Sequence, residues 1–249
     1  MLKTIDFGET DRILTLLTRH FGKVSVVAKG IRKPTSRLAG HAEPLTHATY
    51  QLARGRNLDV LTGAESRALY RALREDLHGI AAGWYIAELA DRFALERSPS
   101  APLFDLVESA LRHLAAGYAP ALVCRWFDLH LLDRTGFRPE LGRCVQCRVS
   151  PTEITNAWIV DAGGLVCAAC APADTHGPHA LTVRALKSLR YLLVSNFDGA
   201  SLLRVDAALA AELERHLRSF LQHVLDREIH AASLIDELAR MPRPAPALT

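Results

Sequence analysis

The chain has 249 residues, of which 49% are hydrophobic and 6% aromatic, and its formal net charge is +3 at pH 7. That length fits one large domain or two to three small ones, and the hydrophobic content is sufficient for a buried core. No apolar run has the length of a membrane span, and no cationic start precedes an apolar segment, so we expect neither a membrane protein nor a secretory signal.

The charge is unevenly distributed along the chain. Residues 1–60 contain ten Lys and Arg residues against five Asp and Glu residues, so this part carries +5 and the remainder −2. A basic module joined to a near-neutral one favours a polyanionic partner for the first sixty residues. A basic face that is merely solvated is equally consistent with the count, and charge alone does not separate the two interpretations.

Residues 1–64 predict a small β barrel. Short segments alternate apolar and polar side chains, and a turn over residues 20–23 closes the first of them. Several short strands with Gly turns and no intervening helix indicate an OB fold or a similar barrel. The β-compatible segments are residues 13–18, 24–29, 45–54 and 58–61.

A basic loop over residues 29–40 separates two of these strands. It has Gly30 and Gly40 near its ends and four cations among its first nine residues. Such a loop can follow a phosphate backbone without reading bases. The chain has no G-x-x-x-x-G-K-[ST] motif, so we expect no ATP hydrolysis of its own. The candidate phosphate-binding residues are Lys23, Lys29, Arg32, Lys33, Arg37, Arg54 and Arg56.

Support for base stacking is poor in the sequence. OB folds that hold single strands tightly present aromatic platforms, and only Phe7, Phe21 and Tyr50 are candidates here. Each of the three fits a hydrophobic core at least as well. We therefore expect any binding of nucleic acid to be sensitive to salt and independent of base sequence.

Residues 64–132 have a helical pattern, because apolar residues recur mostly every three or four positions. Residues 98–102, which include two prolines, interrupt it, and Pro120 begins a further helix. Cys124 lies in that helix and is expected to be a buried structural thiol. His113 and His130 are lone helical histidines, for which a structural role is the expectation.

Four of the five cysteines form two C-x-x-C pairs, Cys144 with Cys147 and Cys167 with Cys170. This spacing is typical of a structural zinc site with four thiolate ligands. Between the pairs, residues 158–160 and 165–166 predict a hairpin with a turn at residues 161–164. A closed four-thiolate site leaves no position for water, so it indicates a structural ion and not metal catalysis.

Other interpretations of the cysteines remain open. Two separate redox pairs are possible, although a redox C-x-x-C is expected near a βαβ pattern, which is absent. Disulfides are disfavoured without a signal peptide, and unligated thiols are a further alternative. His176 and His179 lie close enough in the sequence to replace a cysteine ligand.

The last part of the chain predicts amphipathic helices over residues 181–194 and 206–226, with Asp206 as the N-cap of the second. Ser233 is the predicted cap of a short helix over 234–240, and prolines predict a disordered tail. The fold class is α+β and multi-domain. The predicted divisions are an OB-fold DNA-binding domain at 1–64, helical parts at 65–141 and 181–240, a zinc-binding insertion at 142–180 and a tail at 241–249.

Three stretches together resemble one protein family. The first is the run Asp6-x-Gly8-Glu9-Thr10-Asp11-Arg12-Ile13-Leu14-Thr15, followed by Gly22-Lys23 and Ala28-Lys29-Gly30. The second is Arg37-Leu38-Ala39-Gly40, which leads to Glu43-Pro44-Leu45. The third is Gly136-Phe137-Arg138-Pro139-Glu140-Leu141, shortly before Cys144. In combination they resemble the RecO family of bacterial DNA repair and recombination mediators, over nearly the whole chain. Family members normally have several residues before the position of Leu2, so Met1 falls within the expected first strand.

The resemblance implies an N-terminal OB fold, a helical domain and a zinc-binding insertion that holds one structural zinc ion. It also implies a cytoplasmic, nucleoid-associated protein that binds single- and double-stranded DNA and anneals complementary strands. With RecR, such a protein helps load RecA onto strands coated by single-strand-binding protein, whose acidic C-terminal tail it contacts. That tail needs an apolar groove beside a cation, and the candidates are Arg125, Arg134, Arg184, Lys187 and Arg190.

We therefore expect a DNA-binding mediator that is not an enzyme. A zinc-ribbon nuclease or a thiol oxidoreductase is the alternative from another class, but no H-E-x-x-H, paired acidic or Ser/His/Asp motif stands out. A purely protein-binding adaptor is a third interpretation. Binding to oligonucleotides over a range of salt concentrations distinguishes the adaptor from the mediator.

Overall fold

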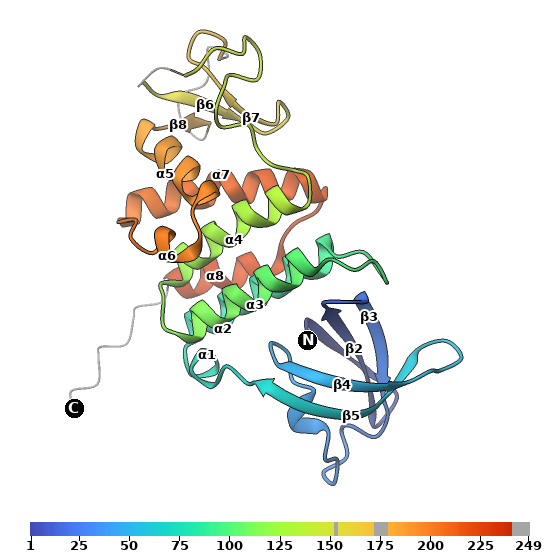
Figure 1. Ribbon diagram of the computed structural model, residues 1–249. Helices are drawn as coiled ribbons and strands as arrows, with labels where there is room; N and C mark the ends of the chain where they lie inside the picture. The colour runs from blue at the N-terminus through green and yellow to red at the C-terminus, as the bar shows by residue number, and fades with distance from the viewer. Residues whose placement is uncertain (152–153, 172–178, 241–249) are drawn as a thin grey trace, which may run out of the picture. The chain divides into compact units, whose positions relative to one another are not determined.

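The computed structural model describes residues 1–151, 154–171 and 179–240 (Figure 1). The chain divides into two compact units, one of Met1–Gly117 with the chain from Ile229 onward, and the other of Tyr118–Glu228. None of the helices in the described ranges is both long and apolar enough to cross a membrane.

The first unit begins with a five-stranded sheet in the order β1-β2-β3-β5-β4. Neighbouring strands are antiparallel except for β3 and β5, which are parallel. The strands are β1 (Lys3–Phe7), β2 (Asp11–Thr18), β3 (Gly22–Ala28), β4 (His47–Ala53) and β5 (Asp59–Ala68). This confirms the predicted N-terminal β region.

The predicted closure of this sheet into a barrel is wrong for the described residues, since β1 and β4 are left as its two edges. At that seam Met1 bridges to the segment before β4. Its amino group donates to the Thr46 carbonyl oxygen at 2.8 Å, and the Leu45 N–H donates to the Met1 carbonyl oxygen at 3.0 Å. Along their lengths β1 pairs with β2 and β4 pairs with β5, and among the described residues no ladder joins β1 to β4.

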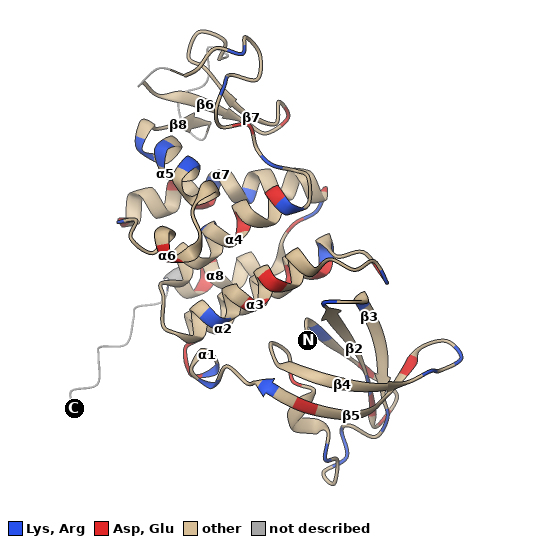
Figure 2. Cartoon of the chain, viewed as in Figure 1, with Lys and Arg blue, Asp and Glu red and all other residues tan. Residues whose placement is uncertain are grey.

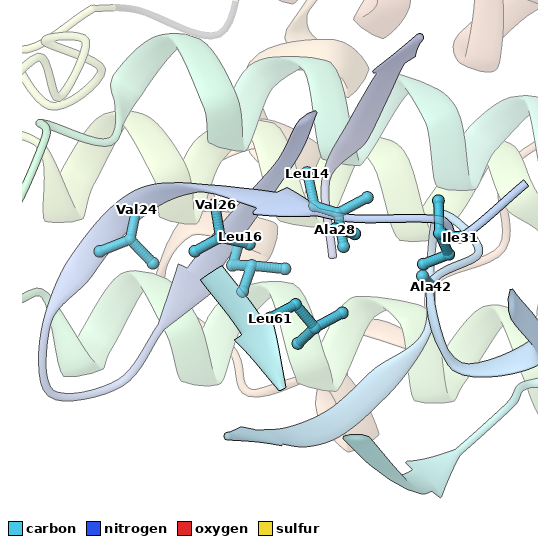
Figure 3. Close-up of a cluster of buried hydrophobic side chains, with 8 residues drawn as sticks. All are labelled: Leu14, Leu16, Val24, Val26, Ala28, Ile31, Ala42 and Leu61. Atoms are coloured by element: carbon cyan, nitrogen blue, oxygen red, sulfur yellow. The ribbon is translucent and has the colours of Figure 1, made fainter. Parts of the chain in front are cut away.

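The sheet has a hydrophobic core because β2 and β3 alternate in side-chain direction and turn one set of residues inward (Figure 3). The cluster consists of Leu14, Leu16, Val24, Val26, Ala28, Ile31, Ala42 and Leu61. Tyr50 packs against it, and its hydroxyl donates to the His41 carbonyl oxygen at 3.1 Å. Phe7 and Phe21 do not belong to it. They are 53% and 70% exposed, so the alternative of a core position does not hold for these two.

The helical pattern expected from residue 64 begins later, because β5 continues to Ala68. Its pairing with β4 runs through Ala64, opposite Tyr50, and Ser66, opposite Ala48, so packing within the sheet overrides the apparent helical spacing. The helices of this unit are α1 (Arg71–Glu75), α2 (Leu77–Phe93), α3 (Ala101–Ala115) and α8 (His230–Arg240), and a short 3₁₀ turn, η1, covers Ala39–His41.

Side chains fix where these helices begin. Asp76 caps α2 by accepting from the N–H groups of His78 and Gly79, which breaks the predicted continuous helix into α1 and α2. Ser100 caps α3, in the interruption that the prolines predict. The predicted cap at Ser233 is wrong: α8 begins at His230, whose N–H donates to the carboxylate of Glu88 in α2.

In its described residues the second unit combines four helices with a small sheet in the order β7-β6-β8. The predicted hairpin over β6 and β7 is confirmed, as are Pro120 at the start of α4 and Asp206 as the cap of α7. Strand β8 and helix α6 were not predicted. The elements are α4 (Pro120–Arg134), β6 (Asn156–Ile159), β7 (Gly164–Val166), β8 (Ala180–Leu181), α5 (Val183–Val194), α6 (Phe197–Ala200) and α7 (Ala207–Leu225). The predicted disordered tail lies outside the described residues.

Candidate functional site

The two C-x-x-C pairs converge in the second unit. The sulfur atoms of Cys144, Cys147, Cys167 and Cys170 all lie within 4.8 Å of one another, and those of Cys147 and Cys167 are 3.6 Å apart. Four sulfurs arranged tetrahedrally at 2.3 Å from a zinc ion would be about 3.8 Å apart. The four cysteines could therefore hold one metal ion.

Backbone geometry builds each half of this site. Cys144 lies on a tight turn, where the Arg148 N–H donates to the Cys144 carbonyl oxygen at 2.9 Å and Arg148 has a φ of 62°. On the other pair, the Cys170 N–H donates to the Cys167 carbonyl oxygen at 3.0 Å. The Cys167 N–H in turn donates to the Cys144 sulfur at 3.3 Å, which joins the two turns.

Gly164 brings the first turn against the hairpin. Its φ is 149°, and a Cβ there would lie 2.4 Å from the Glu140 carbonyl oxygen. That close approach lets the Leu165 N–H donate to the Glu140 carbonyl oxygen and the Val145 N–H donate to the Leu165 carbonyl oxygen, both at 2.9 Å. The segment that carries Cys144 is thus aligned along β7.

The thiol pKa values indicate why a cation fits here. Burial opposes ionisation of Cys144, but N–H donors from Cys167, Cys147 and Gln146 outweigh it and lower the pKa of this thiol to about 6. The Cys147 sulfur raises the pKa of Cys170 to about 12. Four thiolates so close together need a positive ion between them, because like charges disfavour one another.

The alternatives for these cysteines can be compared with the geometry. All five cysteines are free, and a 3.6 Å separation is far longer than a disulfide bond of about 2.05 Å. The cluster contains no histidine among the described residues; His176 lies outside them. Cys124 is buried apart from the cluster, and burial raises its pKa to about 12, as expected for a structural thiol.

The lone helical histidines also have structural contacts. The ring nitrogen Nε2 of His130 lies 3.0 Å from the Ser195 carbonyl oxygen, and that of His113 lies 3.1 Å from the Ser109 hydroxyl.

The basic loop after β3 is anchored to the β1–β2 turn. The Gly30 N–H donates to the Asp11 carboxylate at 2.7 Å, and the Arg32 N–H donates to the Thr10 carbonyl oxygen at 2.9 Å. That bond from Gly30 is the main cause of the lowered pKa of Asp11, and the charges of Lys29 and Lys33 lower it further. Main-chain bonds thus fix the base of the loop while its cations extend from it.

Most cations of this loop face solvent without an acidic partner. Lys29, Lys33 and Arg37 are exposed, and within the described part of the chain no carboxylate lies at ion-pair distance from them. Arg32 is also exposed and lies 3.4 Å from Asp6, whose side chain is 56% exposed. We call Lys29, Arg32, Lys33 and Arg37 the cation loop.

The structure does not bring all seven candidate cations together. Lys23 is held away from solvent, since its ammonium group donates to the Asp91 carbonyl oxygen at 2.5 Å and lies 3.3 Å from the Asp91 carboxylate. Arg54 and Arg56 are exposed in the β4–β5 loop. Because β3 and β5 are parallel, the loop before β5 and the loop after β3 leave the sheet in opposite directions. Figure 2 shows Lys and Arg in both loops.

A groove of about 320 Å³ lies in the second unit beside the end of α5. Its apolar lining includes Leu141, Leu193 and Val194, and Arg190 lies at it with its Nε bonded to the Leu141 carbonyl oxygen at 2.8 Å. Among the other candidate cations for an acidic tail, Arg125 is buried in an ion pair with Asp128, and Arg184 pairs with Asp206.

The chain matches two family models. Residues 1–70 match the model described as Recombination protein O N terminal, and residues 74–232 match Recombination protein O C terminal. A DNA repair protein RecO from Roseiflexus sp. (strain RS-1) is 39% identical over 243 residues, which cover 98% of this chain and 85% of that relative. One from Dehalococcoides mccartyi (strain ATCC BAA-2266 / KCTC 15142 / 195) is 34% identical over 94% of this chain and 91% of its own. One from Nocardioides sp. (strain ATCC BAA-499 / JS614) is 39% identical over 88% and 94%.

Proposed function

This chain belongs to the RecO family of DNA repair proteins, and from that premise we propose that it is a non-enzymatic recombination mediator that binds DNA and anneals complementary single strands. The observation that carries the proposal is the cation loop, because exposed cations on a fixed main-chain base are suited to a phosphate backbone. Arg54 and Arg56 extend the binding surface to a second loop of the same sheet.

Annealing follows from charge neutralisation. Two DNA strands repel each other through their phosphates, and bound cations reduce that repulsion while raising the local concentration of both strands. Base pairing between the strands then supplies the free energy, so no bond in DNA is broken and no nucleotide is hydrolysed.

The metal ion of the four cysteines is proposed to be structural zinc. An ion held by four thiolates has no open coordination position, so it stabilises the turns and takes no part in chemistry. Zinc is supported by the all-sulfur ligand set and by the sulfur separations. The residues 144–170 would then depend on the ion for their fold.

The remaining partners are proposed from the family. With RecR, the protein would help load RecA onto strands coated by single-strand-binding protein, in the bacterial cytoplasm at the nucleoid. The groove at Arg190 is our candidate for the acidic tail of single-strand-binding protein, since its lining combines apolar side chains with the cations of Arg138 and Arg190. The Glu140 carboxylate, which also lines the groove, accepts from the N–H groups of Gly142 and Arg143. Arg125 is unsuited to that role because its side chain is buried and forms an ion pair with Asp128.

An annealing assay with purified protein, accompanied by metal analysis, tests the proposal. We expect faster annealing of complementary oligonucleotides without nucleotide or magnesium, and about one equivalent of zinc. Strand cleavage that needs magnesium and survives loss of the thiolates would instead favour a zinc-ribbon nuclease. Absence of any DNA binding at low salt would favour a protein-binding adaptor.

A further inference from the structure

The edge strand β1 exposes two large apolar side chains on one face. Ile5 is 55% exposed and Phe7 is 53% exposed, and because they are two residues apart in a strand they point to the same side. Edge strands of natural proteins are usually protected by charge or cover, so this exposure is unusual for a surface without a partner.

The register of the sheet places Phe7 beside the cation loop. Phe7 is paired with Asp11 on β2, and the next β2 residue, Arg12, is paired with Ala28 at the end of β3. Continuing that ladder by one residue puts Lys29 level with Asp11, so Phe7, Asp11 and Lys29 lie in one row across the end of the sheet. With neighbouring strands about 4.8 Å apart, the Cα atoms of Phe7 and Lys29 are roughly 10 Å apart.

The acidic residues around this row are largely occupied. Asp11 accepts from the Gly30 N–H and from the Thr10 hydroxyl, and Asp6 pairs with Arg12 and with Arg32. Glu9 differs, since it is exposed and no cation within the described part of the chain pairs with it.

We propose that Phe7 is a base-stacking residue, and that Phe7 with Lys29, the cation-loop residue in its row, forms a site for single-stranded DNA. This inference rests on the proposed DNA-binding function and adds a preference for single strands. The phosphates contact Lys29 and its neighbours, and an unpaired base stacks on the exposed phenyl ring. In duplex DNA the bases are stacked on each other, so Phe7 contributes to single-strand binding alone.

The test compares Phe7→Ala with Phe21→Ala by fluorescence anisotropy, using labelled oligothymidylate and a labelled duplex at the same salt concentration. Phe21 is the matched control, because it is also an exposed aromatic residue of this sheet but lies in the β2–β3 turn, away from Lys29. We expect Phe7→Ala to weaken oligothymidylate binding roughly tenfold, with duplex binding unchanged, and Phe21→Ala to change neither.

Two further variants separate stacking from simple apolar contact. Phe7→Trp is expected to retain single-strand affinity and to report it by quenching of the new indole fluorescence, whereas Phe7→Leu is expected to lose affinity as Phe7→Ala does. Glu9→Gln is expected to strengthen binding to both DNA forms, since it removes a negative charge beside the site.

The results that overturn this inference differ from those that overturn DNA binding itself. The stacking role is refuted if Phe7→Ala leaves DNA binding intact, or weakens duplex and single-strand binding equally. The proposed mediator function is unaffected by either result. A change of oligomeric state in Phe7→Ala, measured by sedimentation, would assign the exposed strand to protein association instead. Wild-type protein that binds no DNA refutes both proposals.

Discussion

The imidazole of His216 lies 5.6 Å from the indole of Trp158, centroid to centroid, with the two planes tilted by 43°. Trp158 lies in β6 between the two cysteine pairs, and His216 lies in α7 and is 1% exposed. His216 Nε2 is also 3.0 Å from the Ala180 carbonyl oxygen in β8. The side chain of His216 therefore fixes the small sheet of β6, β7 and β8 to α7, through an aromatic contact with Trp158 and a hydrogen bond to Ala180.

This contact predicts a dependence of stability on pH. Burial is the main cause that lowers the pKa of His216 to about 4; Arg215 and His179 lower it further, while the hydrogen bond to Ala180 and the charge of Glu212 oppose the shift. The unfolded chain, with a histidine pKa of about 6.5, binds the proton more readily. The free energy of unfolding should therefore fall as pH drops from about 6.5 towards 4, by up to about 3 kcal/mol.

Urea unfolding across this pH range measures the effect, with His216→Gln as the comparison. Glutamine keeps a donor for the Ala180 carbonyl oxygen but does not titrate, so the variant should lose less stability on acidification than the wild type. Parallel curves for the two proteins would show that His216 is not the responsible group.

Loss of a thiolate should release the metal. We expect the double variant Cys144→Ser, Cys147→Ser to bind less than one equivalent of metal and to unfold or precipitate, because the fold of the turns depends on the ion. Cys124→Ala is the control, since Cys124 is buried like Cys144 but lies outside the cluster. Elemental analysis and circular dichroism measure both. A double variant that stays folded and still anneals DNA would contradict the structural role of the metal ion.

Gly164 should tolerate no side chain. An alanine there has both an unfavourable φ and a Cβ 2.4 Å from the Glu140 carbonyl oxygen, so Gly164→Ala should destabilise the protein by more than about 1 kcal/mol. Gly163→Ala has a positive φ but open space, so its cost should be smaller. Thermal unfolding of the two variants checks this order, and equal losses would refute the close approach.

The cations should differ in their effect on DNA affinity. The triple variant Arg32→Ala, Lys33→Ala, Arg37→Ala should remain folded, lose most DNA binding and show a shallower dependence on salt. Lys23→Ala should leave affinity unchanged, because Asp91 already holds that ammonium group. Anisotropy titrations separate the two cases. A loss for Lys23→Ala as large as that of the triple variant would contradict the assignment.

The cysteine spacing and the period-two alternation are local signals, and they predicted the cluster of four cysteines that could hold a metal ion, the hairpin before Cys167 and the core strands β2 and β3. The helix cap at Asp206 follows from local chemistry in the same way. These features needed no knowledge of distant contacts.

Features set by long-range pairing could not be predicted. The extension of β5 to Ala68 depends on its partner β4, and the ion pair of Lys23 depends on Asp91, which lies far along the chain. The exposure of Phe7 has no local signal either, since an aromatic residue in a strand is usually buried; only the open edge of the sheet leaves it in solvent.

The most direct test of the account is the binding of purified wild-type protein to a labelled single strand over salt concentrations between about 50 and 200 mM. Release of counterions by the four residues of the cation loop together with Arg54 and Arg56 predicts that log affinity falls linearly with log salt, with a slope of about −4. Affinity that is flat across this range, or no binding at the lowest salt, would contradict a protein that gathers DNA strands by their charge.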